Sequence, residues 1–234
     1  MIYINRNNPP NDLAEREKKY LDIIKQNNLR DNDLIYKWYK QNYKKEELGY
    51  STSETKKILS EMCNMRCPFC GKIVKINTSD NSQTKNMLTI EHMKPQESFP
   101  MEILNWDNLL PCCSRCNSCR KNKPYNENLY LNPTTVNDLN ELFDFTIDGE
   151  IIPSVGTTDV EQQKAKYMID LYNLNSNSKK KLHLKNERSE FFFQILDENF
   201  EKILALEKID KKEYIRSNSI IFYDMYLYNE RRKK

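Results

Sequence analysis

Cys67-Pro68-Phe69-Cys70 and Cys113-Ser114-Arg115-Cys116-Asn117 are the two stretches that decide how this chain folds. Each Cys-x-x-Cys pair places two sulfurs on one tight turn, and two such turns complete a tetrahedral zinc site. A plain zinc ribbon separates its pairs by about 15–20 residues, whereas 42 residues lie between these two. We therefore expect one structural zinc ion, held by Cys67, Cys70, Cys113 and Cys116, with a substantial insert between its halves. The alternative, four unrelated core thiols, is disfavoured by the paired spacing.

The other three cysteines, Cys63, Cys112 and Cys119, are most simply buried small hydrophobic residues. Cys112 is the one that could replace its neighbour Cys113 as a zinc ligand. The N-terminus lacks the apolar core of a signal peptide, and no apolar run reaches the length of a transmembrane helix. We therefore expect a cytoplasmic protein without a membrane partner, in which cysteines are thiols or metal ligands instead of disulfides.

Hydrophobic periodicity divides the chain into three regions with different patterns. The expected helices cover 11–24, 34–39, a stretch after a capping box at Ser51 and Glu54, 114–122, 159–172, 192–204 and 214–226. The expected strands cover 73–76 and 88–92, followed by an irregular stretch over 95–111, and a hairpin covers 142–155 with its turn at Asp148-Gly149. The fold class is therefore α+β and mostly helical. The expected domains are a helical region 1–62, a zinc-stapled strand-strand-helix module 63–125, and a hairpin with helices 126–234.

The insert between the cysteine pairs carries Glu91, His92 and Asn108, and Asn117 follows the last zinc ligand. Carboxylate and amide oxygens suit a hard cation such as magnesium or manganese, and a histidine suits a general base near neutral pH. Soft and hard ligands within one short region predict two metal sites with different roles. Asn117 could equally be a helix cap, and Asn108 a turn residue. The other histidine, His183, lies among lysines and is read as a surface residue.

Net charge is +3, too small to establish a nucleic-acid partner by itself. Residues 60–125 contain nine Lys and Arg against six Asp and Glu, so the excess positive charge lies in this region. Four basic residues on or near the short helix are candidates for nucleic-acid contact: Arg115, Arg120, Lys121 and Lys123. A merely solvated face is the alternative reading of the same residues.

These motifs together resemble the HNH, or ββα-metal, nuclease superfamily, over about a quarter of the chain. The resemblance implies that Glu91 and Asn117 hold a catalytic Mg²⁺ or Mn²⁺ ion, separate from the structural Zn²⁺. It implies that His92 is the general base and that Asn108 orders the loop that orients it. The sequence departs from the commoner pattern in having Glu for Asp at position 91 and Asn for His at position 117, which leaves the reach of the metal ligands open.

A narrower similarity, to the PtuB family of Septu and retron-linked anti-phage effectors, covers most of residues 67–190. Its stretches are Ile90 to Pro95, Asn105 to Leu110, Leu131-Asn132-Pro133, Phe145 to Ile152 and Tyr172 to Asn175. This likeness implies a DNA endonuclease in phage defence with a PtuA-type ATPase partner, which the flanking helices could contact. The alternatives are an HNH nuclease of another setting, such as restriction or mobile-element cleavage, and a non-catalytic zinc module that binds nucleic acid or protein.

Overall fold

The computed structural model describes all residues except residue 2 and the ranges 77–86, 137–138, 146–149 and 177–234. The expected helices over 192–204 and 214–226, the turn at 148–149 and His183 lie outside the described residues. The chain is organised as two units, one of residues 4–67 and 72–117, the other of 1–3, 68–71 and 118 onward. The three-domain division expected from the sequence stays a prediction. No helix among the described residues is long and apolar enough to cross a membrane.

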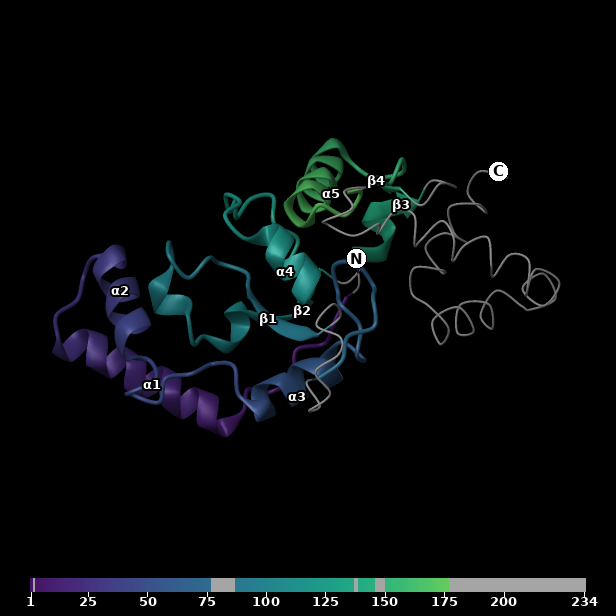
Figure 1. The fold of residues 1–234 in the computed structure, drawn as a ribbon. Helices are drawn as coiled ribbons and strands as arrows, with labels where there is room; N and C mark the ends of the chain where they lie inside the picture. The colour runs from purple at the N-terminus through teal and green to yellow at the C-terminus, as the bar shows by residue number, and fades with distance from the viewer. Residues whose placement is uncertain (2, 77–86, 137–138, 146–149, 177–234) are drawn as a thin grey trace. The chain divides into compact units, whose positions relative to one another are not determined.

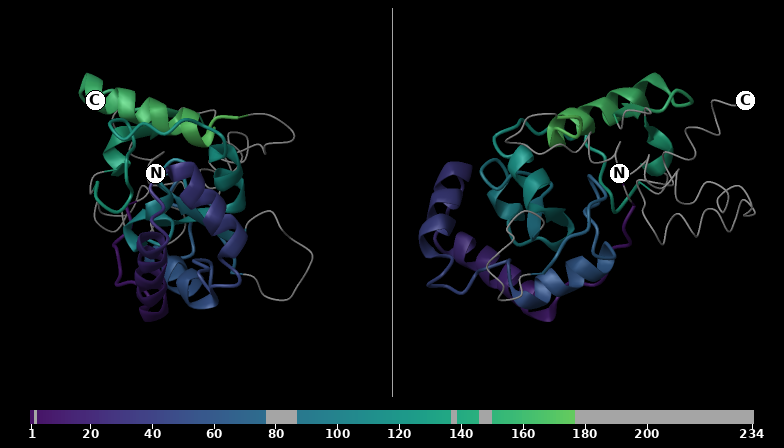
Figure 2. Two further views of the ribbon diagram at one scale, coloured as in Figure 1. Left: turned by 90° about the vertical axis from the view of Figure 1, so that its left-hand side faces the viewer. Right: turned by 45° about the vertical axis from the view of Figure 1, so that its right-hand side comes forward.

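Three helices open the first unit: α1 (Asn11–Gln26), α2 (Asn32–Asn42) and α3 (Ser53–Met62). They are separate elements, coloured purple to blue in Figures 1 and 2. The buried residues of α1 are Leu13, Tyr20 and Ile24, spaced as one face of a helix. The Tyr20 hydroxyl donates a hydrogen bond to the carbonyl of Pro100 (2.9 Å), so α1 is tied to the segment that follows the first strand.

The expected capping box of α3 at Ser51 is wrong by one residue. Thr52 is the N-cap, because its side-chain oxygen accepts from the Thr55 backbone N–H (3.1 Å). Ser51 lies one residue before the cap.

A strand pair followed by a helix forms the centre of the first unit (Figure 1). Strand β1 (Leu88–His92) pairs antiparallel with β2 (Leu109–Cys113), and α4 (Ser114–Arg120) follows β2 without a loop. Two 3-10 turns, η2 (Pro100–Glu102) and η3 (Trp106–Asn108), fill the connection between the strands. The mixed helix and strand class is confirmed, and so is the strand-strand-helix order of the module.

The partner of β1 is not the one expected from the sequence. Residues 73–76 form only isolated bridges, Arg66 with Ile73 and Lys75 with Met87, and no strand. The true partner β2 has the sequence pattern of a loop because Pro111 interrupts it, and proline cannot donate to a sheet ladder. Among the described residues this sheet has two strands, so β2 is an edge strand there, where proline is tolerated.

The second unit contains the expected hairpin and the helix after it. Strands β3 (Phe143–Phe145) and β4 (Ile151–Pro153) pair antiparallel, preceded by η4 (Leu139–Leu142). Helix α5 (Asp159–Tyr172) begins at a capping box in which Thr158 and Glu161 bond each other's backbone N–H groups, and it runs unbroken in green in Figure 2. Asn173 ends it in the left-handed conformation (φ 52°). Hairpin and helix are confirmed.

Candidate metal centre and nuclease site

The four cysteines predicted to bind zinc come together. The Sγ atoms of Cys67, Cys70, Cys113 and Cys116 all lie within 4.8 Å of one another, and all four residues are buried. Sulfurs that share one zinc ion at about 2.3 Å lie about 3.8 Å apart in a tetrahedron, so a small adjustment closes the site. The residues fit a structural zinc ion.

The local backbone explains why the cysteine turns have this geometry. In the first turn, the Cys67 N–H donates to the carbonyl of Lys72 (2.8 Å), and Gly71 adopts a positive φ of 74° that side chains disfavour. In the second turn, the Cys116 N–H points at the Cys113 sulfur (3.4 Å).

The structure decides between Cys112 and Cys113. Cys113 belongs to the four-sulfur cluster, whereas Cys112 is fully buried and its thiol donates to the carbonyl of Cys113 (3.4 Å). Burial raises the pKa of Cys112 well above its ordinary value, and so favours the thiol there. Cys63 and Cys119 are also buried, and both lie outside the cluster, as expected.

Glu91 and His92 are the last two residues of β1, and both are buried, with 4% and 8% exposure. A buried carboxylate is costly unless a cation or hydrogen-bond donors compensate its charge. Both residues lie in the paired register, Glu91 opposite Leu110 and His92 opposite Leu109, so strand alternation directs their side chains to opposite faces at this point. The chain bends at residues 93–94, directly after β1.

Hydrogen bonds fix the tautomer of His92. Its Nε2 lies 2.9 Å from the carbonyl oxygen of Ile103, which can only accept, so Nε2 carries the proton. Nδ1 is then the basic nitrogen of the neutral ring. Burial lowers the pKa of His92 to about 4, opposed in part by the Ile103 carbonyl, so the ring is neutral at pH 7.

This burial predicts a pH dependence of stability. In the unfolded chain a histidine is protonated below its pKa of about 6.5, whereas in the folded protein His92 stays neutral down to about pH 4. The unfolded state therefore binds more protons between these values, and the free energy of unfolding decreases as the pH falls from about 6.5 to about 4. We expect wild type to lose on the order of 3 kcal/mol more unfolding free energy than His92→Asn between pH 7 and pH 4. Urea unfolding of both proteins at several pH values measures the difference. Equal losses would contradict a buried neutral ring.

Two residues that sequence reasoning missed surround the imidazole. The Gln96 amide nitrogen lies 3.0 Å from Nδ1 and 3.3 Å from Nε2, and it donates to the Tyr50 hydroxyl (3.1 Å). Nearly equal distances to both ring nitrogens place this amide against the ring, away from the in-plane lone pair of Nδ1. The Tyr50 and His92 rings meet edge to face, with centroids 4.6 Å apart. Tyr50 and Gln96 therefore restrict the ring while the basic lone pair stays unblocked by them.

Both the oxygen and the nitrogen of the Asn108 side-chain amide form hydrogen bonds with the segment that follows β1. Its oxygen accepts from the Lys94 N–H (2.7 Å), and its nitrogen donates to the carbonyls of Lys94 (3.2 Å) and Glu102 (2.9 Å). The Asn108 carbonyl also accepts from the Met93 N–H (3.0 Å). These bonds grip the two residues that follow His92, and they satisfy a side chain that is only 2% exposed.

Asn117, on α4, is bound to β1 through its amide nitrogen. That nitrogen donates to the Thr89 hydroxyl and to the Ile90 carbonyl, both at 3.1 Å. The side chain therefore lies beside the residue that precedes Glu91. With the amide hydrogens engaged, the oxygen is the end of the side chain that suits a hard cation. A carboxylate and an amide oxygen on neighbouring elements fit Mg²⁺ or Mn²⁺ better than zinc.

The four basic candidates differ in accessibility. Arg115 and Arg120 are buried, with 6% and 5% exposure, and Arg120 donates to the carbonyl of Lys123 (2.8 Å). The Lys123 ammonium bonds the carbonyl of Asp170. Burial argues against direct phosphate contact by the two arginines, because a phosphate must reach the guanidinium. Among these four, Lys121 is the fully exposed side chain.

Comparison with known families agrees with this geometry. Residues 67–123 match the family described as HNH endonuclease. The matched range begins at the first zinc ligand and contains Glu91, His92, Asn108 and Asn117. The resemblance to HNH nucleases predicted from the motifs is therefore confirmed.

Two relatives named Septu protein PtuB are also similar to the chain. The one from Bacillus thuringiensis is 27% identical over 162 residues, which cover 68% of this chain and 53% of the relative. The one from Bacillus mycoides (strain KBAB4) is 26% identical over 86 residues, which cover 31% of this chain and 26% of the relative. The chain thus spans about half the length, or less, of the relatives that it matches.

Proposed function

We propose that this protein is a metal-dependent HNH endonuclease that hydrolyses phosphodiester bonds in DNA. The observation that supports the proposal is the attachment of Asn117 to Thr89 and Ile90, the residues of β1 that precede Glu91 and His92. Glu91, His92 and Asn117 all lie within the range that matches the HNH family.

In this proposal, each residue of the site has one task. Glu91 and Asn117 hold a divalent Mg²⁺ or Mn²⁺ ion through their side-chain oxygens. When bound, the cation supplies charge stabilisation to the scissile phosphate and the leaving oxygen. His92 accepts a proton at Nδ1 from the attacking water, since Nε2 is committed to the Ile103 carbonyl. Asn108 fixes the backbone of the two residues after His92 and so restrains its position.

The zinc cluster serves this site as a frame in the same proposal. Cys113 is the last residue of β2, and Cys116 lies on α4, one residue before Asn117. Fixing these two sulfurs fixes the angle between β2 and α4, and thereby the distance from Asn117 to Glu91. A module with so small a sheet gains rigidity from a metal that its apolar core alone would not supply.

The biological setting is proposed from the relatives. Similarity to proteins named Septu PtuB supports an effector nuclease of an anti-phage defence system that works with a PtuA-like ATPase. Co-expression with a PtuA-like ATPase from the same genome, followed by co-purification, tests the partner. An HNH nuclease of restriction or mobile elements would purify without it.

Plasmid cleavage tests the nuclease proposal. Zinc-loaded protein with Mg²⁺ or Mn²⁺, with and without its partner, should nick or linearise the plasmid, and EDTA should stop the reaction. His92→Ala should lower the rate by about 100- to 10,000-fold, the usual contribution of a general base. His183→Ala, which alters the other histidine, is the matched control. Cleavage that survives His92→Ala would refute the base, and a wild type inactive under all conditions would favour a binding module.

A further inference from the structure

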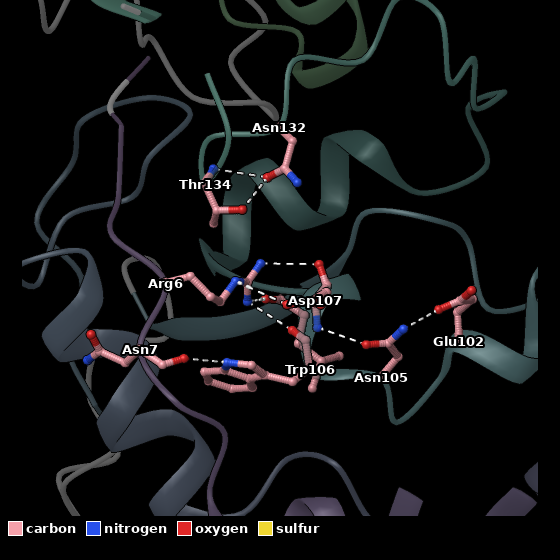
Figure 3. Close-up of polar contacts among 9 residues, drawn as sticks. Arg6, Asn7, Glu102, Asn105, Trp106, Asp107, Asn132 and Thr134 are labelled. Carbon is pink, nitrogen blue, oxygen red and sulfur yellow. Dashed lines mark hydrogen bonds and ion pairs between the residues drawn. The ribbon is translucent and has the colours of Figure 1, made fainter. Parts of the chain in front are cut away.

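The N-terminal arm ahead of α1 is fastened through Arg6 to η3 and to the first residue of β2 (Figure 3). The Arg6 guanidinium donates to three backbone carbonyls, those of Trp106 (2.9 Å), Leu109 (2.7 Å) and Asp107 (3.2 Å). These contacts join residues about a hundred positions apart in the sequence. Three acceptors on one fork require the planar guanidinium, and a lysine ammonium could not match them.

The contact is reciprocal and largely shielded from solvent. The Trp106 indole N–H donates to the carbonyl of Asn7 (2.7 Å), and the Arg6 guanidinium lies 5.4 Å from the centre of the Trp106 ring. The Arg6 side chain is 16% exposed, and burial lowers its pKa, an effect that Asp107 partly opposes. Ile4 anchors the start of the arm with 2% exposure.

Arg6 binds residues 106–109, the segment that contains Asn108 and the cross-strand partner of His92. Trp106 and Asp107 form η3 with Asn108, whose side chain holds the backbone of Lys94. Leu109, whose carbonyl accepts from Arg6, is the cross-strand partner of His92. Releasing Arg6 frees three carbonyls on either side of Asn108, the residue that bonds the two residues following His92. Arg6 itself touches none of the reacting groups.

We propose that Arg6 is a positioning residue for the nuclease site, acting through η3 and Asn108 on His92. The inference rests on the proposed function, and it adds the N-terminal arm to the machinery of the module. A misplacement of about 1 Å at a reacting group costs about 100-fold in rate. We therefore expect Arg6→Ala to slow single-turnover DNA cleavage by about that factor, with zinc content and DNA affinity unchanged.

The experiment uses the full chain with its zinc and a built-in reporter. The chain has two tryptophans, Trp38 and Trp106, so in a Trp38→Phe background, excited where tyrosine does not absorb, the emission comes from Trp106. In that background Arg6→Ala should shift Trp106 emission to the red and raise its quenching by acrylamide, because Trp106 is 6% exposed when the arm is docked.

Compared with Arg6→Ala, Arg6→Lys should restore little of the cleavage rate. Guanidinium ion, tested against equal sodium chloride, should rescue Arg6→Ala and leave Arg6→Lys unchanged. Arg30→Ala, at an exposed arginine, is the matched control.

Hydrogen exchange separates the failure of this inference from failure of the nuclease proposal. The Lys94 amide, which donates to Asn108, should lose protection in Arg6→Ala, while helix α1 keeps its own. An Arg6→Ala protein that cleaves within two-fold of wild type, or that keeps Lys94 protected, overturns the positioning role. If wild type does not cleave but Lys94 loses protection, the nuclease proposal fails and the link from Arg6 to Asn108 stands.

Discussion

Cys113→Ala is expected to remove zinc from the protein and to lower the free energy of unfolding by at least about 4 kcal/mol. Cys113 supplies one of four clustered sulfurs, and the loss of one opens a closed tetrahedral site. Zinc binding is worth roughly 10–16 kcal/mol in small zinc-dependent peptides, so even a partial loss exceeds most single-residue effects. Because Cys113 joins β2 to α4, the strand-strand-helix module should lose its fold.

The neighbouring cysteine provides a matched control for this prediction. Cys112 is equally buried and carries the same side chain, but it lies outside the four-sulfur cluster. Cys112→Ala should retain one zinc per chain and cost only about 1–2 kcal/mol. Elemental analysis of the purified variants and urea unfolding measure both effects. Zinc lost from Cys112→Ala and retained by Cys113→Ala would reverse the assignment.

Glu91→Gln is expected to abolish DNA cleavage down to the level seen in EDTA. The substitution keeps the size of a side chain that is 4% exposed and removes its charge. Residues that only support metal ligands alter affinity by about 10- to 100-fold, so loss of a charged ligand should exceed about 100-fold. The sulfur cluster contains no carboxylate, and zinc should therefore stay bound.

A control for Glu91→Gln must remove the same charge elsewhere. Glu61→Gln changes an exposed residue of α3 and should leave both cleavage and metal binding unaltered. Rates at increasing Mg²⁺ should show whether Glu91→Gln is rescued by excess cation. Wild-type rates in Glu91→Gln at all cation concentrations would show that residue 91 is not a metal ligand.

Local spacing explains which parts of this protein can be predicted well from its sequence. Paired cysteines determine their own turn, so the four zinc ligands can be found without knowledge of the fold. The alternating run Leu88 to His92 predicts β1 with its observed bounds. Strand β2 escapes prediction because Pro111 and the polar residues before it have the pattern of a loop. The pairing of β2 with β1 depends on the connection between the two strands, which contains η2 and η3, and on the Cys113 sulfur at the end of β2.

Residues that act through long-range contacts leave no pattern in the sequence. Arg6 reaches η3 across about a hundred residues, and Tyr50 reaches Gln96 across 46. Neither lies in a motif, and an arginine in a polar arm is usually solvated. Conversely, the basic residues on either side of Asn117 suggest an exposed face, but Arg115 and Arg120 are buried. Charge in a sequence does not report whether a side chain faces solvent.

The central claim is that a sulfur site and an oxygen site bind different metals, a few residues apart, for different purposes. Electron paramagnetic resonance of zinc-loaded protein titrated with Mn²⁺ tests it most directly, because it counts bound manganese while zinc is silent. We predict one Mn²⁺ per wild-type chain with all zinc retained, and loss of the Mn²⁺ but not the zinc in Glu91→Gln. Equal Mn²⁺ binding by wild type and Glu91→Gln, or Mn²⁺ that displaces the zinc, would contradict it.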